Sequence, residues 1–254
     1  MTIVDALILG IVEGVTEFLP ISSTGHLILT AQLLGISGEF VKSFEIAIQL
    51  GAILAVLVLY GARFLKNPQI QKNVLVAFLP TAVGGLFLYK IVKTVFFESI
   101  PLILAALFLG GIALILFEKL YKEKGDTLAD LEKMSYRQAF SIGCFQVIAM
   151  VPGVSRAAAT IIGGLLVGLS RRAVVEFSFL LAVPTMLAAT ALDLIKSGTA
   201  FSAGEHGLLV LGGLTAFISA LIAVRWFVSF ISSHDFTRFG IYRIALALAW
   251  WVAL

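Results

Sequence analysis

Long apolar runs separated by short polar segments dominate the chain. Each run has roughly 20 residues, the number that an α-helix needs to cross ~30 Å of hydrocarbon. Apolar residues are near-continuous within the runs and do not alternate as they do in the strands of a membrane β-barrel. The pattern therefore predicts an all-α integral membrane protein with spans at 43–62, 74–92, 100–118, 173–192, 207–226 and 239–254.

Two further apolar segments are interrupted by a turn and differ from these spans. Residues 2–19 end at Pro20, and the next apolar piece, 23–34, amounts to only about 18 Å of helix, too short to cross a bilayer. Residues 143–150 lead in the same way into a second Pro-containing turn, followed by a short apolar piece that ends at Leu169. Both patterns indicate re-entrant helical hairpins, whose irregular backbone is tolerated at membrane depth only inside protein or beside a wet cavity.

The two halves of the chain resemble each other at an offset of 132 to 134 residues. Three matches occur in the same order in both halves: Pro20-x-x-Ser23 with Pro152-x-x-Ser155, Phe44–Ala55 with Phe177–Ala188, and Thr81-Ala82 with Thr215-Ala216. The prediction is one membrane domain, 1–254, made of repeat one (1–118), a linker (119–137) and repeat two (138–254). Each repeat is expected to hold a re-entrant hairpin and three transmembrane helices.

Three spans are an odd number, so the second half must enter the membrane from the opposite side, which gives an inverted-topology repeat with its hairpins meeting near the midplane. Loops 63–73 and 119–137 together carry eight Lys and Arg residues. The positive-inside rule places both loops in the cytoplasm and residues 35–42 outside. The first hairpin is then expected to enter from the outer face.

Composition narrows the chemistry further. Only 13% of residues are charged, and the net charge of +3 suits cytoplasmic loops better than nucleic-acid binding. The single Cys144 excludes an intrachain disulfide and any metal site built from several cysteines.

The first hairpin carries an unusual polar cluster within its apolar surroundings. Glu13 and Glu17 are four residues apart and share one helix face, where they are expected to share a proton or a divalent cation such as Mg²⁺ or Ca²⁺. Both arrangements suit phosphate hydrolysis, and intramembrane carboxylates are functional by default. The alternative is a structural pair that faces another helix.

Hydroxyl groups and an imidazole follow this acidic pair. Ser22, Ser23 and Thr24 lie where a helix begins, and each by itself is explained equally well as a helix cap. His26 follows Ser23 by three residues, so on a helical turn the imidazole could reach the Ser23 hydroxyl as a base.

The second hairpin carries a pattern typical of an anion site. Pro152-Gly153-Val-Ser155-Arg156 places unpaired backbone N–H groups, a hydroxyl and a guanidinium at a helix N-terminus, all of which favour phosphate. Arg243, near the start of the last span, is either a further anion ligand or an interfacial anchor. Acids and a nucleophile in one hairpin and an arginine in the other favour phosphoryl transfer on an anionic lipid.

These motifs resemble those of a known family. The pattern at 13–26, Pro-Gly-x-Ser-Arg at 152–156, and the segments 163–171, 176–179 and 242–243 resemble bacterial undecaprenyl-diphosphate phosphatases of the bacitracin-resistance type. The resemblance implies hydrolysis of undecaprenyl diphosphate to the monophosphate and inorganic phosphate, which recycles the carrier lipid for peptidoglycan synthesis. It also implies a bacterial inner-membrane location, an active site that faces outward, and dependence on, or stimulation by, a divalent cation such as Mg²⁺ or Ca²⁺.

Carried over by position, the family's acidic pair falls on Glu13 and Glu17, its Ser and His on Ser23 and His26, and its arginines on Arg156 and Arg243. With the residue patterns above, the prediction is catalytic roles for Glu13, Glu17, Ser23, His26 and Arg156, metal ligation by Glu13 and Glu17, and substrate binding by Ser22, Thr24, Gly153, Ser155 and Arg243. One departure is that Ala157-Ala158 stand where the family usually has Ser-Gly, which could narrow or dry the phosphate site. A polyprenyl-phosphate transporter or flippase is the alternative function, since inverted repeats are also transporter architecture. The sequence leaves a homodimer open.

Overall fold

The computed structural model describes residues 1–91, 99–123, 127–197 and 202–253. Positions 92 and 254, at the ends of predicted spans, and residues 124–126 of the predicted linker lie outside these ranges. Within them the chain is all-helical, as predicted, and has no β-strand beyond an isolated bridge between Leu128 and Leu169. The described helices are α1 (Ile3–Thr16), α2 (Ser23–Leu33), α3 (Glu39–Lys66), α4 (Pro68–Ile91), α5 (Ile100–Leu120), the 3₁₀ turn η2 (Leu131–Lys133), α6 (Tyr136–Ile148), α7 (Arg156–Leu166), α8 (Arg171–Ser197), α9 (Ala203–Ile231) and α10 (Thr237–Ala253).

Five of the described helices, α3, α4, α5, α8 and α9, are long and apolar enough to cross a membrane. They coincide with five of the six predicted spans, so the protein is a multi-pass membrane protein. The sixth predicted span corresponds to α10, which has 17 residues. At about 25 Å it falls a few ångströms short of the usual hydrocarbon thickness.

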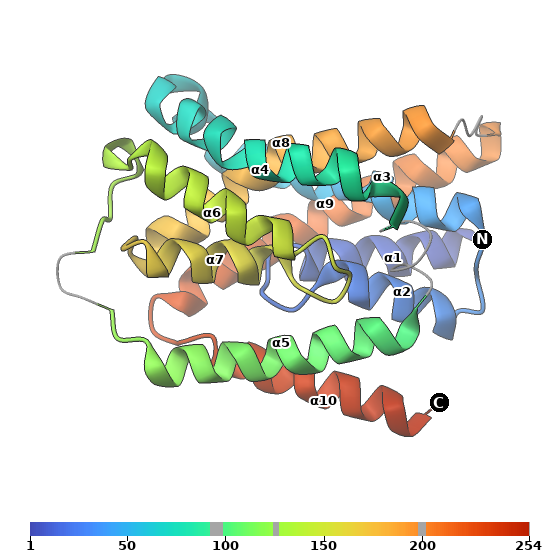
Figure 1. Cartoon of the computed structure of the whole chain (residues 1–254). Coiled ribbons are helices and arrows are strands. Elements are labelled where there is room, and N and C mark those ends of the chain that lie inside the picture. Colours follow the sequence, from blue (N-terminus) through green and yellow to red (C-terminus); the bar gives the residue numbers. More distant parts are fainter. Residues whose placement is uncertain (92–98, 124–126, 198–201, 254) are drawn as a thin grey trace.

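Four shorter helices form two pairs, α1 with α2 and α6 with α7. They have 14, 11, 13 and 11 residues, and an irregular turn separates the members of each pair. In Figure 1 the two pairs lie at opposite ends of the bundle, and their turns approach each other at mid-length. The turns therefore bring residues from the two halves of the sequence to one place in the interior.

Each short pair packs mainly on a long helix from the other half of the sequence: α1 contacts α9, and α6 contacts α4. Glycines allow the backbones to touch. A Cβ atom at Gly14 would lie 2.3 Å from the carbonyl oxygen of Ala216, and one at Gly143 would lie 2.1 Å from that of Ala77. Small residues at helix interfaces are the usual means of close packing in lipid.

An ion pair ties together three helix ends near the 63–73 and 119–137 loops. The Arg171 guanidinium donates to both carboxylate oxygens of Glu118, at 2.6 and 2.7 Å. Glu118 also accepts from the backbone N–H of Phe236 at 3.0 Å. This bidentate arrangement fixes α8 and the start of α10 against the end of α5.

The close contact at Gly143 is testable. Gly143→Ala should destabilise the protein by about 1–3 kcal/mol, because the added methyl group forces α6 away from the α4 backbone. Gly207→Ala in α9 is the control, since nothing lies within 4 Å of a Cβ there. Thermal unfolding in detergent measures both variants, and equal midpoints would contradict the proposed packing.

Candidate active site

Side chains from the two turns meet directly. The Ser155 hydroxyl donates to the carbonyl oxygen of Leu19 at 3.3 Å. The Arg156 guanidinium donates through Nη2 to the Glu17 carboxylate at 2.9 Å. The ion pair is almost completely buried, with 11% of the arginine side chain and 3% of the glutamate side chain exposed. The structure thus joins the acidic cluster of the first half to the arginine of the second.

The Glu17 carboxylate is the centre of this cluster. One of its oxygens accepts from Arg156, and the other accepts a short hydrogen bond from the Ser23 hydroxyl. Arg156 is held in turn by Ser178, to whose carbonyl oxygen and hydroxyl it donates at 2.7 and 3.2 Å. A carboxylate that accepts from a serine hydroxyl is positioned to remove the hydroxyl proton.

Two helix N-termini face this cluster. Ser22 caps α2 and has a positive φ of 71°, the only non-glycine residue with a positive φ in the described chain. Ser155 caps α7 in the same way and accepts from the N–H of Ala158 at 3.1 Å. The first N–H groups of a helix have no intrahelical partner, so those of Ser23, Thr24 and Arg156 are available to an anion.

A cavity of about 140 Å³ lies where the two helix ends meet. Its lining combines these helix ends with polar groups from the long spans: Glu17, Ser22, Ser23, Thr24, Gln49, Thr81, Gln146, Ala149, Met150, Val154, Ser155, Arg156, Thr185, Met186 and Ala189. Its polar donors and single guanidinium make it suitable for a phosphate group.

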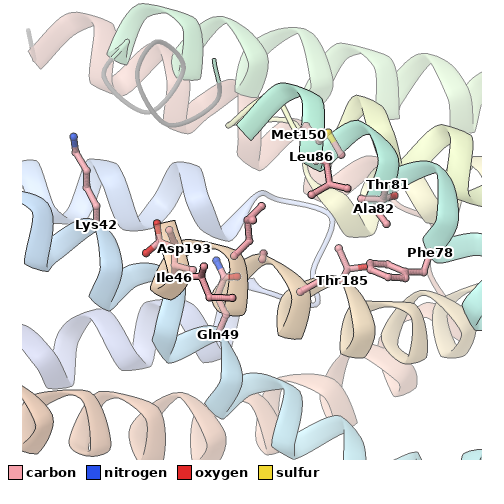
Figure 2. Close-up of a pocket in the computed structure, with 15 residues that line it drawn as sticks. Lys42, Ile46, Gln49, Phe78, Thr81, Ala82, Leu86, Met150, Thr185 and Asp193 are labelled. Atoms are coloured by element: carbon pink, nitrogen blue, oxygen red, sulfur yellow. The ribbon is translucent and has the colours of Figure 1, made fainter. Parts of the chain in front are cut away.

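An apolar cavity of about 500 Å³ adjoins it between α3, α4 and α8 (Figure 2). Apolar side chains, among them Ile46, Phe78 and Leu86, line most of it, while Lys42 and Asp193 lie at one end (Figure 2). The cavities share five lining residues and therefore lie side by side. Together they fit an amphiphile with an anionic head and an apolar tail.

Glu13 is fully buried, and neither of its carboxylate oxygens has a hydrogen-bond partner in the described part of the chain. This free carboxylate fits a cation, but the predicted pair does not form a complete site, because Glu17 is already engaged by Arg156 and Ser23. Among the described residues, no group of three or more His, Cys, Asp or Glu side chains is arranged to hold a metal ion. Mg²⁺ and Ca²⁺ take at least six oxygen ligands.

His26 does not lie where its spacing from Ser23 predicts. Its Nδ1 lies 2.7 Å from the carbonyl oxygen of Ser22, and its Nε2 lies 2.8 Å from the Tyr242 hydroxyl. A carbonyl only accepts, so Nδ1 carries the proton and Nε2 accepts from Tyr242. The expected contact with Ser23 fails because α2 directs the imidazole back to the residue four positions earlier, while Ser23 points to Glu17. In this geometry His26 holds the strained Ser22 backbone in place.

Arg243 also lies away from the cavity. It is 1% exposed, and its guanidinium donates to four backbone carbonyls: Pro20 at 3.4 Å, Ala106 at 3.0 Å, Leu107 at 3.3 Å and Gly153 at 2.8 Å. Pro20 belongs to one turn and Gly153 to the other. The residue therefore clamps the two turns together on α5, and it is neither an interfacial anchor nor, in this arrangement, in contact with the cavity.

Gly153 of the second turn and two alanines in the first turn of α7 can also be placed. Gly153 has a φ of 92°, and a Cβ there would lie 2.6 Å from the carbonyl oxygen of Ile103, so it shapes the turn instead of lining the cavity. Ala157 and Ala158, the departures from the family pattern, are buried in the hydrophobic core. Their methyl groups do not line the polar cavity, so the narrowing expected there does not arise.

Several polar residues of the site were not singled out from the sequence. Four of them are polar side chains of the long spans and of α6 that line the cavity. The other two are Ser178, which accepts from Arg156, and Tyr242, which is hydrogen-bonded to His26. The sequence signal that could have found them is the presence of polar side chains inside apolar spans, where they mark functional sites. The residues are Gln49, Thr81, Gln146, Ser178, Thr185 and Tyr242.

The fold and the site define a helical membrane protein with a buried anion site at the head of an apolar cavity. A family model described as "Bacitracin resistance protein BacA" matches residues 6–249. The chain is 54% identical to a protein named undecaprenyl-diphosphatase from Aquifex aeolicus (strain VF5), over 98% of each chain. It is 51% identical to one of the same name from Sulfurihydrogenibium sp. (strain YO3AOP1), over 99% of each. The chain therefore belongs to the BacA bacitracin resistance family.

The Arg243 clamp is testable by substitution. Arg243→Lys should lower the free energy of unfolding by about 2–5 kcal/mol, because an ammonium group cannot reach all four carbonyls from one position. Arg238→Lys, on the exposed side of the same helix, should have an effect within about 0.5 kcal/mol. Thermal unfolding in detergent measures both variants. A Lys variant of normal stability but low activity would show instead that Arg243 binds substrate.

Proposed function

We propose that this protein hydrolyses undecaprenyl diphosphate to undecaprenyl phosphate and inorganic phosphate, in keeping with the name undecaprenyl-diphosphatase that its relatives carry. The observation that carries the proposal is the Glu17–Ser23–Arg156 cluster between two helix N-termini. It lies at the head of an apolar cavity of about 500 Å³, which suits the prenyl chain. A transporter needs the arginine, but it does not need a serine hydroxyl bonded to a carboxylate.

The chemistry follows from these contacts. The terminal phosphate of the substrate lies in the polar cavity, where Arg156 and the free N–H groups balance its charge. Glu17 accepts the proton as the Ser23 oxygen attacks the terminal phosphorus, and the bond to the bridging oxygen breaks to release the prenyl monophosphate. Water then hydrolyses the phosphoserine. In the alternative route Glu17 and Ser23 position a water molecule that attacks directly.

The divalent cation expected at Glu13 and Glu17 stays a prediction, and the proposed reaction does not use it. Glu13 offers one free carboxylate, so further ligands would have to come from water or from the diphosphate.

We also propose that the halves form an inverted repeat in the bacterial inner membrane, with the active site open to the outer side. Support comes from the sequence offset, from the placement of the short helix pairs at opposite ends of the bundle (Figure 1), and from the reciprocal packing of α1 on α9 and α6 on α4. The basic residues of loops 63–73 and 119–137 support a cytoplasmic location for the end of the bundle that carries these two loops.

The catalytic assignment is tested by phosphate release from a long-chain prenyl diphosphate in detergent, with and without a chelator. Ser23→Ala and Glu17→Gln should nearly abolish release, because they remove the nucleophile or its base. Arg156→Lys should lose on the order of a thousandfold, since a lysine keeps the charge but not the fork that reaches both Glu17 and phosphate.

Arg225→Lys, at an exposed position of α9 outside both cavities, is the matched control and should turn over normally. A phosphorylated Ser23 trapped on the enzyme would identify the covalent route. Robust hydrolysis by Ser23→Ala would exclude that route, and wild-type turnover in Arg156→Lys would refute the role of the guanidinium.

The proposed orientation predicts which positions an impermeant thiol reagent reaches in intact cells. In a Cys144→Ala background, Ser37→Cys should be labelled from outside, and Glu132→Cys should be labelled only after the membrane is opened. Both positions are exposed at the ends of the helical bundle. The reverse labelling pattern would overturn the assignment of sides.

A further inference from the structure

The polar and apolar cavities share five lining residues, which come from three spans and from the turn after α6. The lining residues common to both are Gln49, Thr81, Met150, Thr185 and Ala189. Three of these are polar: Gln49 on α3, Thr81 on α4 and Thr185 on α8, all labelled in Figure 2. Polar groups in the wall of an otherwise apolar cavity are costly unless they bind something.

The hydrogen bonds at this junction determine which groups can still donate. The Gln146 side-chain amide donates to the Thr81 hydroxyl oxygen at 2.7 Å and to the Thr185 hydroxyl oxygen at 3.1 Å. The Thr185 hydroxyl donates its only proton to the carbonyl oxygen of Leu181 at 2.8 Å. Thr185 therefore has no proton left to donate.

Thr81 differs from Thr185 in this respect. Its oxygen accepts from Gln146, and its own proton has no acceptor in the part of the chain that the structure describes. The side-chain amide of Gln49 likewise forms no hydrogen bond with any described residue. The junction, where both cavities share lining residues, thus presents an O–H donor from α4 and N–H donors from α3.

We propose that Gln49 and Thr81 bind the proximal phosphate of the substrate, the one esterified to the prenyl chain. This inference rests on the proposed function. If the terminal phosphate lies with Arg156 and Ser23 and the prenyl chain lies in the apolar cavity, the proximal phosphate must lie between them. The spare donors match its non-bridging oxygens, which can only accept.

The placement gives these two residues a specific part in the reaction. When the phosphoanhydride bond breaks, the proximal phosphate gains negative charge as the leaving group. Neutral donors stabilise that charge without binding the product as strongly as a second arginine would. Gln49 and Thr81 therefore select a diphosphate over a prenyl monophosphate, which has no second phosphate to place at the junction.

Sulfur substitution in the substrate tests this role separately from stability. The probes are a short-chain prenyl diphosphate and its analogue with one non-bridging oxygen of the proximal phosphate replaced by sulfur, a weak acceptor. In the wild type, loss of one hydrogen bond to a charged group should lower kcat/KM by about tenfold to a hundredfold. In Thr81→Val and Gln49→Leu, the oxygen substrate should already be slow, and the ratio of oxygen to sulfur rates should fall toward one.

Thr215→Val is the matched control, because Thr215 is the equivalent of Thr81 in the other half and donates to the carbonyl oxygen of Leu211. It should keep the full sulfur effect. A merely structural defect in Thr81→Val or Gln49→Leu would slow both substrates equally and leave the ratio unchanged. Such an unchanged ratio, or a wild-type ratio near one, would overturn the inference. A wild-type protein that hydrolyses neither substrate would instead refute the proposed function.

Discussion

The buried ion pair between Glu17 and Arg156 is the interaction on which the rest of the site depends. It joins residues 139 positions apart in the sequence at a distance of 2.9 Å. Charges removed from water are tolerated only when they are paired and hydrogen-bonded, and loss of one partner leaves the other uncompensated. The same carboxylate accepts a hydrogen bond from the Ser23 hydroxyl, so the contact that holds the two turns together also orients the hydroxyl that we propose as the nucleophile.

A second layer of contacts keeps this pair in position. Arg243 ties both turns to α5 through backbone carbonyls, and His26 ties the Ser22 carbonyl to Tyr242 on α10. These residues act on the backbone, whereas Glu17, Ser23 and Arg156 act through side chains that face the cavity. Because Arg243 and His26 hold the backbone of the first turn, the strained conformation of Ser22 persists inside a bundle of regular helices.

Much of this arrangement was predictable from the sequence because it depends on local patterns. Apolar run length predicts the long helices, Pro20 and Pro152 predict the turns, and the polar residues beside them predict Glu17, Ser23 and Arg156 as the site. The roles of His26 and Arg243 were not predictable in the same way. The role of Arg243 depends on the packing of α10 against α5. The role of His26 depends on the backbone conformation of Ser22 and on the position of Tyr242 in α10. Both are properties of the tertiary structure.

The reciprocal packing of α1 on α9 and α6 on α4 has a consequence for biosynthesis. The α1–α2 segment, which ends at Leu33, leaves the ribosome about 170 residues before Ala203 begins α9, the helix that covers Gly10 and Gly14. Until α7 and α9 are inserted, Glu17 lacks its arginine and α1 lacks its main helical neighbour, and polar groups of this kind are costly in lipid without partners. We therefore expect α1 and α2 to reach their final packing only after the C-terminal half is in the membrane, and neither half to form a stable unit without the other.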